Sequence, residues 1–327
     1  MSLYPALRHR AVGGALALLV LGITAVTAIT VERGADPTPA SGNRSAASTG
    51  PGPDGGPAID GSTIQWPQDG QSAVELVGAG SPQARGDQRP VPIASLTKVM
   101  TAHVILKEHP LRPGEPGPLI EVDRQAFHEV AVGGESTVPV QAGQKYSLRQ
   151  LLELLLIPSG NNVARLLARW DSGSQEAFAK KMQRTADDLG MGRSTYTGAS
   201  GIEPTTTSTA VDQLKLARQA MKDPVFREIV ASRTITVPGI GPITNTNSLL
   251  DTPGVVGIKT GSSTPAGGNL LWACEVRSGD TTRMLLGAVL HQRANTTPNE
   301  GMHAALENSR RLITDLRDRL TSARTER

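Results

Sequence analysis

Three short motifs occur in a fixed order along this chain, and together they constrain its fold more than any other feature. Ser95-Leu96-Thr97-Lys98 reads S-x-x-K, Ser159-Gly160-Asn161 reads S-x-N, and Lys259-Thr260-Gly261 reads K-T-G. Each motif alone is short enough to arise by chance. Their order indicates one catalytic site, so the fold must bring segments from both halves of the chain together.

The first motif pairs an alcohol with an amine. In a helix, positions i and i+3 lie on one face, so Ser95 and Lys98 are predicted to project side by side. A serine hydroxyl is a weak nucleophile without an adjacent base. A lysine can be that base only when burial or a nearby cation lowers its pKa.

The N-terminal segment is predicted to direct export. Arg8 and Arg10 precede an apolar run over 11–31, which is long enough to span a bilayer and longer than most signal-peptide cores. Basic residues on its N-terminal flank place that end in the cytoplasm. Residues 1–33 are therefore read as a membrane anchor, or as a signal peptide cleaved after Ala28. Both alternatives remain open, and both send the rest of the chain out of the cytoplasm.

Composition separates a tether from a folded part. Residues 34–62 are rich in Gly, Pro, Ser, Ala and Thr and carry too little apolar surface to fold, so they are predicted to form a disordered linker. Residues 63–327 are predicted to form the catalytic domain, which the linker would hold off the membrane.

The remaining composition excludes several classes of function. The net charge of +3 is small and the basic residues form no stripe, which argues against a nucleic-acid partner. No CxxC, HExxH or His/Asp cluster indicates a metal site, and the proposed chemistry needs no cofactor. The single cysteine, Cys274, lies in an apolar run and is predicted to be a small core residue.

The middle of the chain is predicted to be mostly helical. A strand over 72–77 precedes a helix from Ser95 to Glu108, which would place the serine at the positive helix end. Ser147 and Gln150 form a capping box before the apolar segment Leu151–Ile157. Pro158, Ser159 and Gly160 then interrupt the pattern, so the S-x-N motif is expected at a helix–helix corner where glycine allows a sharp turn and close approach. Further helices are expected after a cap at Ser172 and over 212–221, the first of them ending at Gly190.

The last third changes to a strand pattern. Strands are expected over 234–237, 255–260, 268–276 and 283–290, and residues 277–280 are read as a hairpin connection. An amphipathic helix over 300–320 closes the chain. The predicted fold class is α+β: an antiparallel sheet flanked by terminal helices, with an inserted helical region and the active site in the cleft between them.

The motifs and their surroundings resemble the D-alanyl-D-alanine carboxypeptidases of serine peptidase family S11, the low-molecular-mass penicillin-binding proteins. Motifs of these three kinds are typical of penicillin-binding active sites, and the resemblance implies a fold of the β-lactamase/transpeptidase type. The resemblance covers about residues 64–292. The segments that carry it are 92–102, 195–202, 208–212, 245–250, 257–261 and 266–268.

The resemblance implies a role for each motif residue. Ser95 is the expected nucleophile and Lys98 its base, while Ser159 would relay a proton to the leaving group. Asn161 would bind the substrate backbone, and Lys259 and Thr260 would hold its terminal carboxylate. Gly261 and Ser262 are the further substrate-binding residues that the resemblance implies. The N–H groups of Ser95 and Ser262 would form the oxyanion hole.

The implied activity is removal of the terminal D-alanine from peptidoglycan stem peptides, with β-lactam antibiotics as inhibitors. The implied location is the outer face of a bacterial cell membrane, or the wall if the segment is cleaved. Two other functions stay open: a β-lactamase, which would need a water-activating carboxylate that no motif supplies, and a non-catalytic wall-binding protein. Endopeptidase and transpeptidase activities share the same acyl-enzyme and are not distinguished by the sequence.

Overall fold

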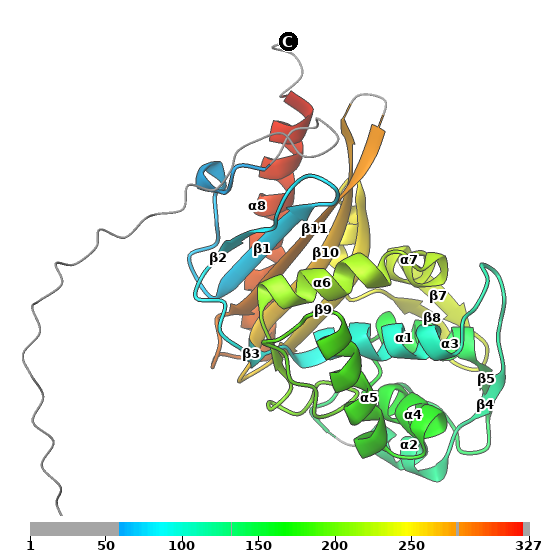
Figure 1. Ribbon diagram of the computed structural model, residues 1–327. Coiled ribbons are helices and arrows are strands. Elements are labelled where there is room, and N and C mark those ends of the chain that lie inside the picture. The colour runs from blue at the N-terminus through cyan, green and yellow to red at the C-terminus, as the bar shows by residue number, and fades with distance from the viewer. Residues whose placement is uncertain (1–58, 132, 279–280, 323–327) are drawn as a thin grey trace, which may run out of the picture. The chain divides into compact units, whose positions relative to one another are not determined.

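A five-stranded antiparallel sheet forms the centre of the protein, here described from a computed structural model. The structure describes residues 59–131, 133–278 and 281–322. The strand order is β2-β1-β11-β10-β9, which places β9 at one edge (Figure 1). The strands are β1 (Gln71–Leu76), β2 (Gln83–Arg85), β9 (Val255–Ser263), β10 (Gly267–Ser278) and β11 (Thr281–Gln292).

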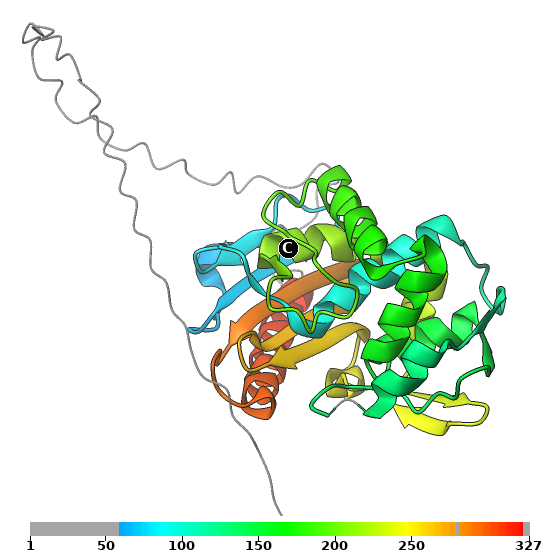
Figure 2. The same ribbon diagram turned by 90° about the horizontal axis from the view of Figure 1, so that it is seen from below.

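Both faces of the sheet are buried along its central strands, because alternate side chains enter different cores. In β10, Leu270 and Trp272 pack with helix α8 (Pro298–Ser322) on one face, whereas Leu271 points into the core on the other face. That second core includes helix α6 (Ala210–Ala220). Figures 1 and 2 show α8 and α6 on opposite sides of the sheet. The predicted α+β class is confirmed, and the helix opposite α8 comes from the interior of the chain.

A helical region follows the first strands and lies beside the β9 edge (Figure 1). Its apolar side chains merge with the core under α6 into one continuous cluster. Its helices are α1 (Thr97–Glu108), α2 (Arg124–His128), α3 (Leu148–Leu156), α4 (Asn161–Ser172), α5 (Gln175–Asp188) and α7 (Pro224–Ala231). Short two-stranded sheets join segments between these helices. In them, β3 (Val91–Pro92) pairs with β6 (Thr207–Ser208), β4 (Leu119–Glu121) with β5 (Lys145–Ser147), and β7 (Thr234–Val237) with β8 (Gly241–Thr244).

Helix ends follow local side-chain chemistry. The predicted capping box is present at α3, where the Ser147 side chain accepts from Gln150 N–H and the Gln150 side chain accepts from Ser147 N–H. The cap predicted at Ser172 is wrong by two residues, because α4 extends through Ser172 and Ser174 caps α5 instead. Gly173 lies between them with φ of +77°, a conformation that ends α4 and that glycine adopts without strain.

Cys274 is the core residue that the sequence predicts. It is fully buried in the core under α8, and burial raises the pKa of its thiol to about 11.

The predicted anchor or signal over 1–33 and nearly all of the predicted linker lie outside the described residues. Among the residues that are described, no helix is long and apolar enough to cross a membrane.

Candidate active site

Ser95 lies in a tight turn just before α1, and its side chain is partly exposed. The turn is a 3₁₀ helix over Ala94–Leu96, so the serine precedes the α-helix in which the sequence placed it. Ala94 has φ of +46°, and its carbonyl oxygen accepts a hydrogen bond from Thr97 Oγ1 at 2.8 Å. A side chain at Gly201 would collide with this carbonyl group. The backbone around Ser95 is therefore held in an uncommon conformation by its neighbours.

Lys98 is fully buried beneath Ser95, one turn along the helix. Its Nζ lies 2.9 Å from Ser95 Oγ, which confirms the predicted side-by-side placement. The same nitrogen donates to Asn161 Oδ1 at 2.6 Å and to the carbonyl oxygen of Ser200 at 2.7 Å. Lys98 thus has three oxygen neighbours from three segments of the chain.

The surroundings of Lys98 favour its neutral form. Its pKa is held well below the ordinary value of 10.5, chiefly because burial removes the ammonium from water. The positive charges of Lys259 and Arg165 lower the pKa further, while the carboxylates of Glu203 and Glu135 oppose the shift. A neutral amine next to a serine hydroxyl is the combination that general-base activation requires.

The second motif lies at the predicted corner between α3 and α4. Ser159, not Gly160, adopts the left-handed conformation there, with φ of +67°. Gly160 provides the predicted close approach, since a Cβ at that position would lie 2.7 Å from Val138 Cγ2. The Ser159 hydroxyl is buried and has no hydrogen-bond partner among the described residues.

Asn161 connects Lys98 to a carboxylate that no motif in the sequence indicates. Asn161 Nδ2 donates to Glu135 Oε2 at 3.0 Å, and Arg165 Nη2 donates to the same oxygen at 2.9 Å. Arg165 also pairs with Glu129 at 2.9 Å. Glu135 comes from a loop before β5, so its proximity to Asn161 is a product of the tertiary fold.

The third motif lies on the edge strand β9, which passes directly over the serine turn. A Cβ on Gly261 would lie 2.9 Å from the backbone nitrogens of both Ser95 and Leu96. Glycine at this position is therefore what lets the two segments approach. Ser262, the other predicted oxyanion-hole residue, is partly exposed beside Gly261 and pairs with Gly268 of β10.

Lys259 is buried in β9 with 1% of its surface exposed. Burial lowers the pKa of its ammonium from 10.5 to about 7. Its Nζ donates to the Thr260 carbonyl oxygen at 3.1 Å, and it has no carboxylate partner among the described residues. The Thr260 hydroxyl lies 2.7 Å from the hydroxyl of Thr246. A buried cation beside a hydroxyl is suited to binding a carboxylate from outside the chain.

The structure thus brings residues of all three motifs together, with Ser159 two positions before Asn161 at the α3–α4 corner. Ser95, Lys98 and Asn161 are joined by direct contacts, and β9 brings Lys259 to Ser262 against the serine turn. The arrangement offers a nucleophile with a buried base, an unpartnered hydroxyl and a carboxylate-binding cation. These are the components of acyl transfer to a serine.

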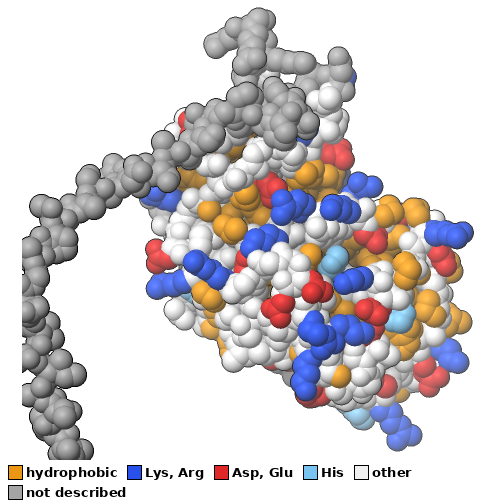
Figure 3. All heavy atoms as spheres, viewed as in Figure 1, with side chains coloured by type: hydrophobic (Ala, Val, Ile, Leu, Met, Phe, Trp, Pro, Cys, Tyr) orange, Lys and Arg blue, Asp and Glu red, His pale blue; other side chains and the backbone are white. Residues whose placement is uncertain are grey.

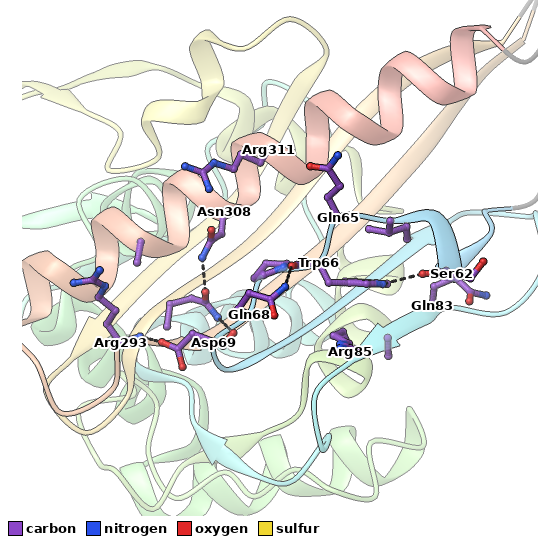
Figure 4. A pocket seen from close by; sticks show the side chains of 16 residues that line it. Ser62, Gln65, Trp66, Gln68, Asp69, Gln83, Arg85, Arg293, Asn308 and Arg311 are labelled. Atoms are coloured by element: carbon purple, nitrogen blue, oxygen red, sulfur yellow. Dashed lines mark hydrogen bonds between the residues drawn. The ribbon is translucent and has the colours of Figure 1, made fainter.

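A cavity of about 890 Å³ lies elsewhere, between α8, β2 and the segment over 61–69. Figure 4 shows Trp66 near its centre and Arg85, Arg293 and Arg311 spread around it. None of the predicted site residues lines this cavity. On the face seen in Figure 3, Lys and Arg side chains are interspersed with Asp and Glu.

Comparison with known proteins gives a consistent result. The family model described as D-alanyl-D-alanine carboxypeptidase, Peptidase S11, matches residues 83–289. A D-alanyl-D-alanine carboxypeptidase of Streptomyces sp. strain K15 is 33% identical over 213 residues, which cover 60% of this chain and 71% of the relative. A D-alanyl-D-alanine carboxypeptidase of Mycobacterium tuberculosis is 34% identical over 182 residues, covering 54% of this chain and 59% of the relative.

Solved structures agree on the fold. The crystal structure of the Streptomyces K15 DD-transpeptidase superposes with a TM-score of 0.66 at 26% identity, covering 77% of this chain and 98% of that one. Penicillin-binding protein 6B of Escherichia coli superposes with a TM-score of 0.65 at 26% identity, over 77% of this chain and 79% of that one. The predicted β-lactamase/transpeptidase-like fold is confirmed.

Proposed function

The chain belongs to the D-alanyl-D-alanine carboxypeptidase family S11 of serine-type hydrolases, and from this premise we propose that it removes the terminal D-alanine from peptidoglycan stem peptides through a Ser95 acyl-enzyme. One observation carries the proposal. The Lys98 amine is fully buried, has a lowered pKa and lies 2.9 Å from the Ser95 hydroxyl. A lysine in this state can act as a base, whereas a solvated lysine cannot.

In the acylation step, Ser95 Oγ attacks the carbonyl carbon of the D-Ala-D-Ala peptide bond while its proton passes to Lys98 Nζ. The negative charge that develops on the carbonyl oxygen is stabilised by the N–H groups of Ser95 and Ser262. The C–N bond then breaks, and the leaving nitrogen takes a proton relayed through Ser159. The unpartnered, buried hydroxyl of Ser159 suits this relay. Water then attacks the ester to release the shortened peptide and restore Ser95.

The substrate's terminal carboxylate is held by Lys259, Thr260 and Gly261. Lys259 offers a buried positive charge that the protein itself does not neutralise with a carboxylate among the described residues. Pairing with the substrate carboxylate would raise the pKa of Lys259 and keep it charged. The β9 edge also presents backbone groups to which an extended peptide can hydrogen-bond, next to Asn161.

The test is incubation of the full chain with a stem pentapeptide ending in D-Ala-D-Ala, followed by mass analysis. Loss of one alanine is expected, and Ser95→Ala should give none. A cross-linked peptide product would replace hydrolysis with transpeptidation, and cleavage of a cross-linked dimer would indicate an endopeptidase. A D-alanyl-D-alanine endopeptidase of Pseudomonas aeruginosa is 31% identical over 205 residues, so the dimer should be included as a substrate.

Labelled penicillin separates the remaining alternatives. A long-lived adduct on Ser95 is expected of the proposed enzyme. Rapid turnover of penicillin would instead support a β-lactamase, and a folded wild-type chain with no adduct would support a non-catalytic wall-binding protein. Ser95→Ala provides the matched control for each measurement.

We also propose that the chain is exported and acts at the outer face of the bacterial membrane. The support is the apolar run over 11–31 behind Arg8 and Arg10. Cell fractionation with N-terminal sequencing tests this. An intact N-terminus in the membrane fraction supports an anchor, whereas a mature chain beginning at Ile29 supports a cleaved signal. Recovery of all the protein in the cytoplasm would contradict export.

A further inference from the structure

The hydrogen bonds around Lys98 leave one direction free on its nitrogen. A neutral amine has two N–H donors and one lone pair in a tetrahedral arrangement. Asn161 Oδ1, at 2.6 Å, and the Ser200 carbonyl oxygen, at 2.7 Å, can only accept. They therefore take both hydrogens, and the lone pair is left for the third neighbour, Ser95 Oγ at 2.9 Å. This is the direction from which a base must receive the serine proton.

The arrangement depends on which end of the Asn161 amide faces Lys98. If the amide were turned over, its NH₂ group could donate to the lone pair of the neutral lysine. The base would then be occupied by a hydrogen bond and unavailable to Ser95. The orientation of one side-chain amide thus decides whether Lys98 can act.

Glu135 determines that orientation. Its Oε2 accepts from Asn161 Nδ2 at 3.0 Å, and a carboxylate cannot donate to the other end of the amide. Arg165 Nη2 donates to the same oxygen at 2.9 Å, and its guanidinium is largely buried. Turning the amide would set Asn161 Oδ1 against the carboxylate, which is unfavourable.

The loop that carries Glu135 is fixed to the start of α4 at several points. The Asn161 backbone N–H donates to the Ser136 carbonyl oxygen at 2.8 Å. The neighbouring Asn162 side chain accepts from Val138 N–H at 3.0 Å and donates to the Val138 carbonyl oxygen at 2.9 Å. Glu135 therefore has little freedom to leave Asn161.

We propose that Glu135 is a positioning residue, held by Arg165, that orients the Asn161 amide so that the Lys98 lone pair is directed at Ser95. The proposal rests on the proposed function, because it assumes that Lys98 activates Ser95. It assigns Glu135 no contact with the substrate and no proton transfer of its own.

Two substitutions distinguish the effect of the side-chain length of Glu135 from the effect of its charge. Glu135→Gln keeps the length but removes the charge, and Arg165, which can only donate, would hold the glutamine oxygen rather than its NH₂ group toward Asn161. Glu135→Asp keeps the charge but withdraws the carboxylate by one methylene. Glu129→Gln is the matched control, because Glu129 pairs with Arg165 in the same network and does not contact Asn161.

The measurement is the rate of Ser95 acylation by a fluorescent penicillin, followed across pH with the full chain. For Glu135→Asp, the maximal rate should fall on the order of 10-fold or more, the effect of one hydrogen bond to a charged group. Glu135→Gln should keep a rate near the wild-type maximum, and Glu129→Gln should do the same. Thermal unfolding of each variant shows that folded proteins are compared.

The pH dependence provides a second readout that a purely structural role would not move. The charged groups that act on Lys98 are Lys259 from β9, Arg165 from α4, Glu203 from the loop before β6, and Glu135. Removing the negative charge of Glu135 should lower the pKa of Lys98. The rise of the acylation rate with pH should therefore begin at lower pH in Glu135→Gln than in the wild type. In Glu129→Gln it should begin at the same pH as in the wild type.

Each outcome decides the matter. Equal maximal rates for wild type and Glu135→Asp would overturn the inference, as would a loss in Glu135→Gln as large as that in Glu135→Asp. If the wild-type chain is not acylated at all, the proposed function itself fails and the inference with it. Acylation of the wild type together with an unaffected Glu135→Asp would overturn the inference alone.

Discussion

At the level of single residues, the proposed function assigns opposite tasks to two buried lysines. Under this proposal Lys98 has to be neutral to accept a proton, whereas Lys259 has to be charged to bind a carboxylate. Both have lowered pKa values because both are buried, but Lys98 also experiences the positive charges of Lys259 and Arg165. These two positive charges lower the pKa of Lys98 in addition to burial, whereas burial alone lowers that of Lys259.

The first prediction concerns Lys98→Arg, which retains the positive charge and lacks the base. A guanidinium stays protonated at any usable pH, so acylation by penicillin should fall by roughly 10²–10⁴-fold, the usual contribution of a general base. Stopped-flow acylation measures the rate, and circular dichroism checks the fold. Near-normal acylation by a folded Lys98→Arg chain would show that Lys98 is not the base.

The second prediction concerns the pH dependence of peptide hydrolysis. The kcat/KM of the free enzyme should rise with pH as Lys98 loses its proton, and fall above about pH 7, where the Lys259 ammonium loses its own. In Lys259→Arg the side chain stays positively charged, so the decline of kcat/KM at high pH should disappear, whatever the maximal value of kcat/KM. If kcat/KM still declines at the same pH in Lys259→Arg, the decline belongs to another group.

At the level of secondary-structure elements, the site depends on how closely β9 lies to the serine turn. Gly261 permits this contact, because a Cβ there would lie 2.9 Å from two backbone nitrogens, which cannot move aside as a flexible side chain could. The strand β9 is in turn held by its pairing with β10 from Gly257 to Ser263. This backbone contact thus positions β9, with Lys259, relative to Ser95.

The third prediction follows from that contact. Gly261→Ala should push β9 away from Ser95 and Leu96 and reduce acylation on the order of 10²-fold, the effect of a misplacement of about 1 Å. Gly192→Ala is the control, since a Cβ at Gly192 meets nothing within 4 Å. The penicillin acylation rate of Gly261→Ala should be clearly lower than that of Gly192→Ala, whereas the unfolding temperatures of the two variants should differ much less. Equal rates would show that the spacing of β9 is not critical.

At the level of the whole molecule, the sheet lies between two cores, and only one of them adjoins the candidate active site. The core between the sheet and α8 contains Trp272, Leu312 and Leu316, whereas the catalytic residues adjoin the other core. Ser95 and Lys98 lie in and after the turn that β9 contacts, on the side of the helical region. A change in the packing of α8 should therefore affect folding before it affects the active site.

The fourth prediction uses this separation. Leu312 is fully buried, so Leu312→Ala should lower the free energy of unfolding by about 2–5 kcal/mol, the cost of a large-to-small change in a core. Arg310→Ala, on the exposed face of the same helix, should change it by less than about 0.5 kcal/mol. Denaturant unfolding measures both variants. Well below the unfolding temperature, both should be acylated at the wild-type rate, and a slowed Leu312→Ala would mean that the two cores are coupled.

Local features of the fold could be predicted from the sequence. The S-x-x-K spacing placed Ser95 beside Lys98, the capping box fixed the start of α3, and the strand-like runs in the last third of the chain predicted β9, β10 and β11. One cap was misplaced by two residues, since Ser174 rather than Ser172 caps α5. At the corner between α3 and α4, Gly160 provides the predicted close approach, whereas Ser159 adopts the left-handed conformation.

The electrostatics of the site could not be predicted from the motifs, because they depend on how the chain folds. Whether Lys98 and Lys259 are buried, and so have lowered pKa values, depends on which segments cover them, and no motif states this. Glu135 is the sharpest case. It carries no motif, yet folding of its loop against α4 places its carboxylate 3.0 Å from Asn161 Nδ2. Motifs report residues that are close in sequence, whereas pKa values and amide orientations are set by residues that become close only when the chain folds.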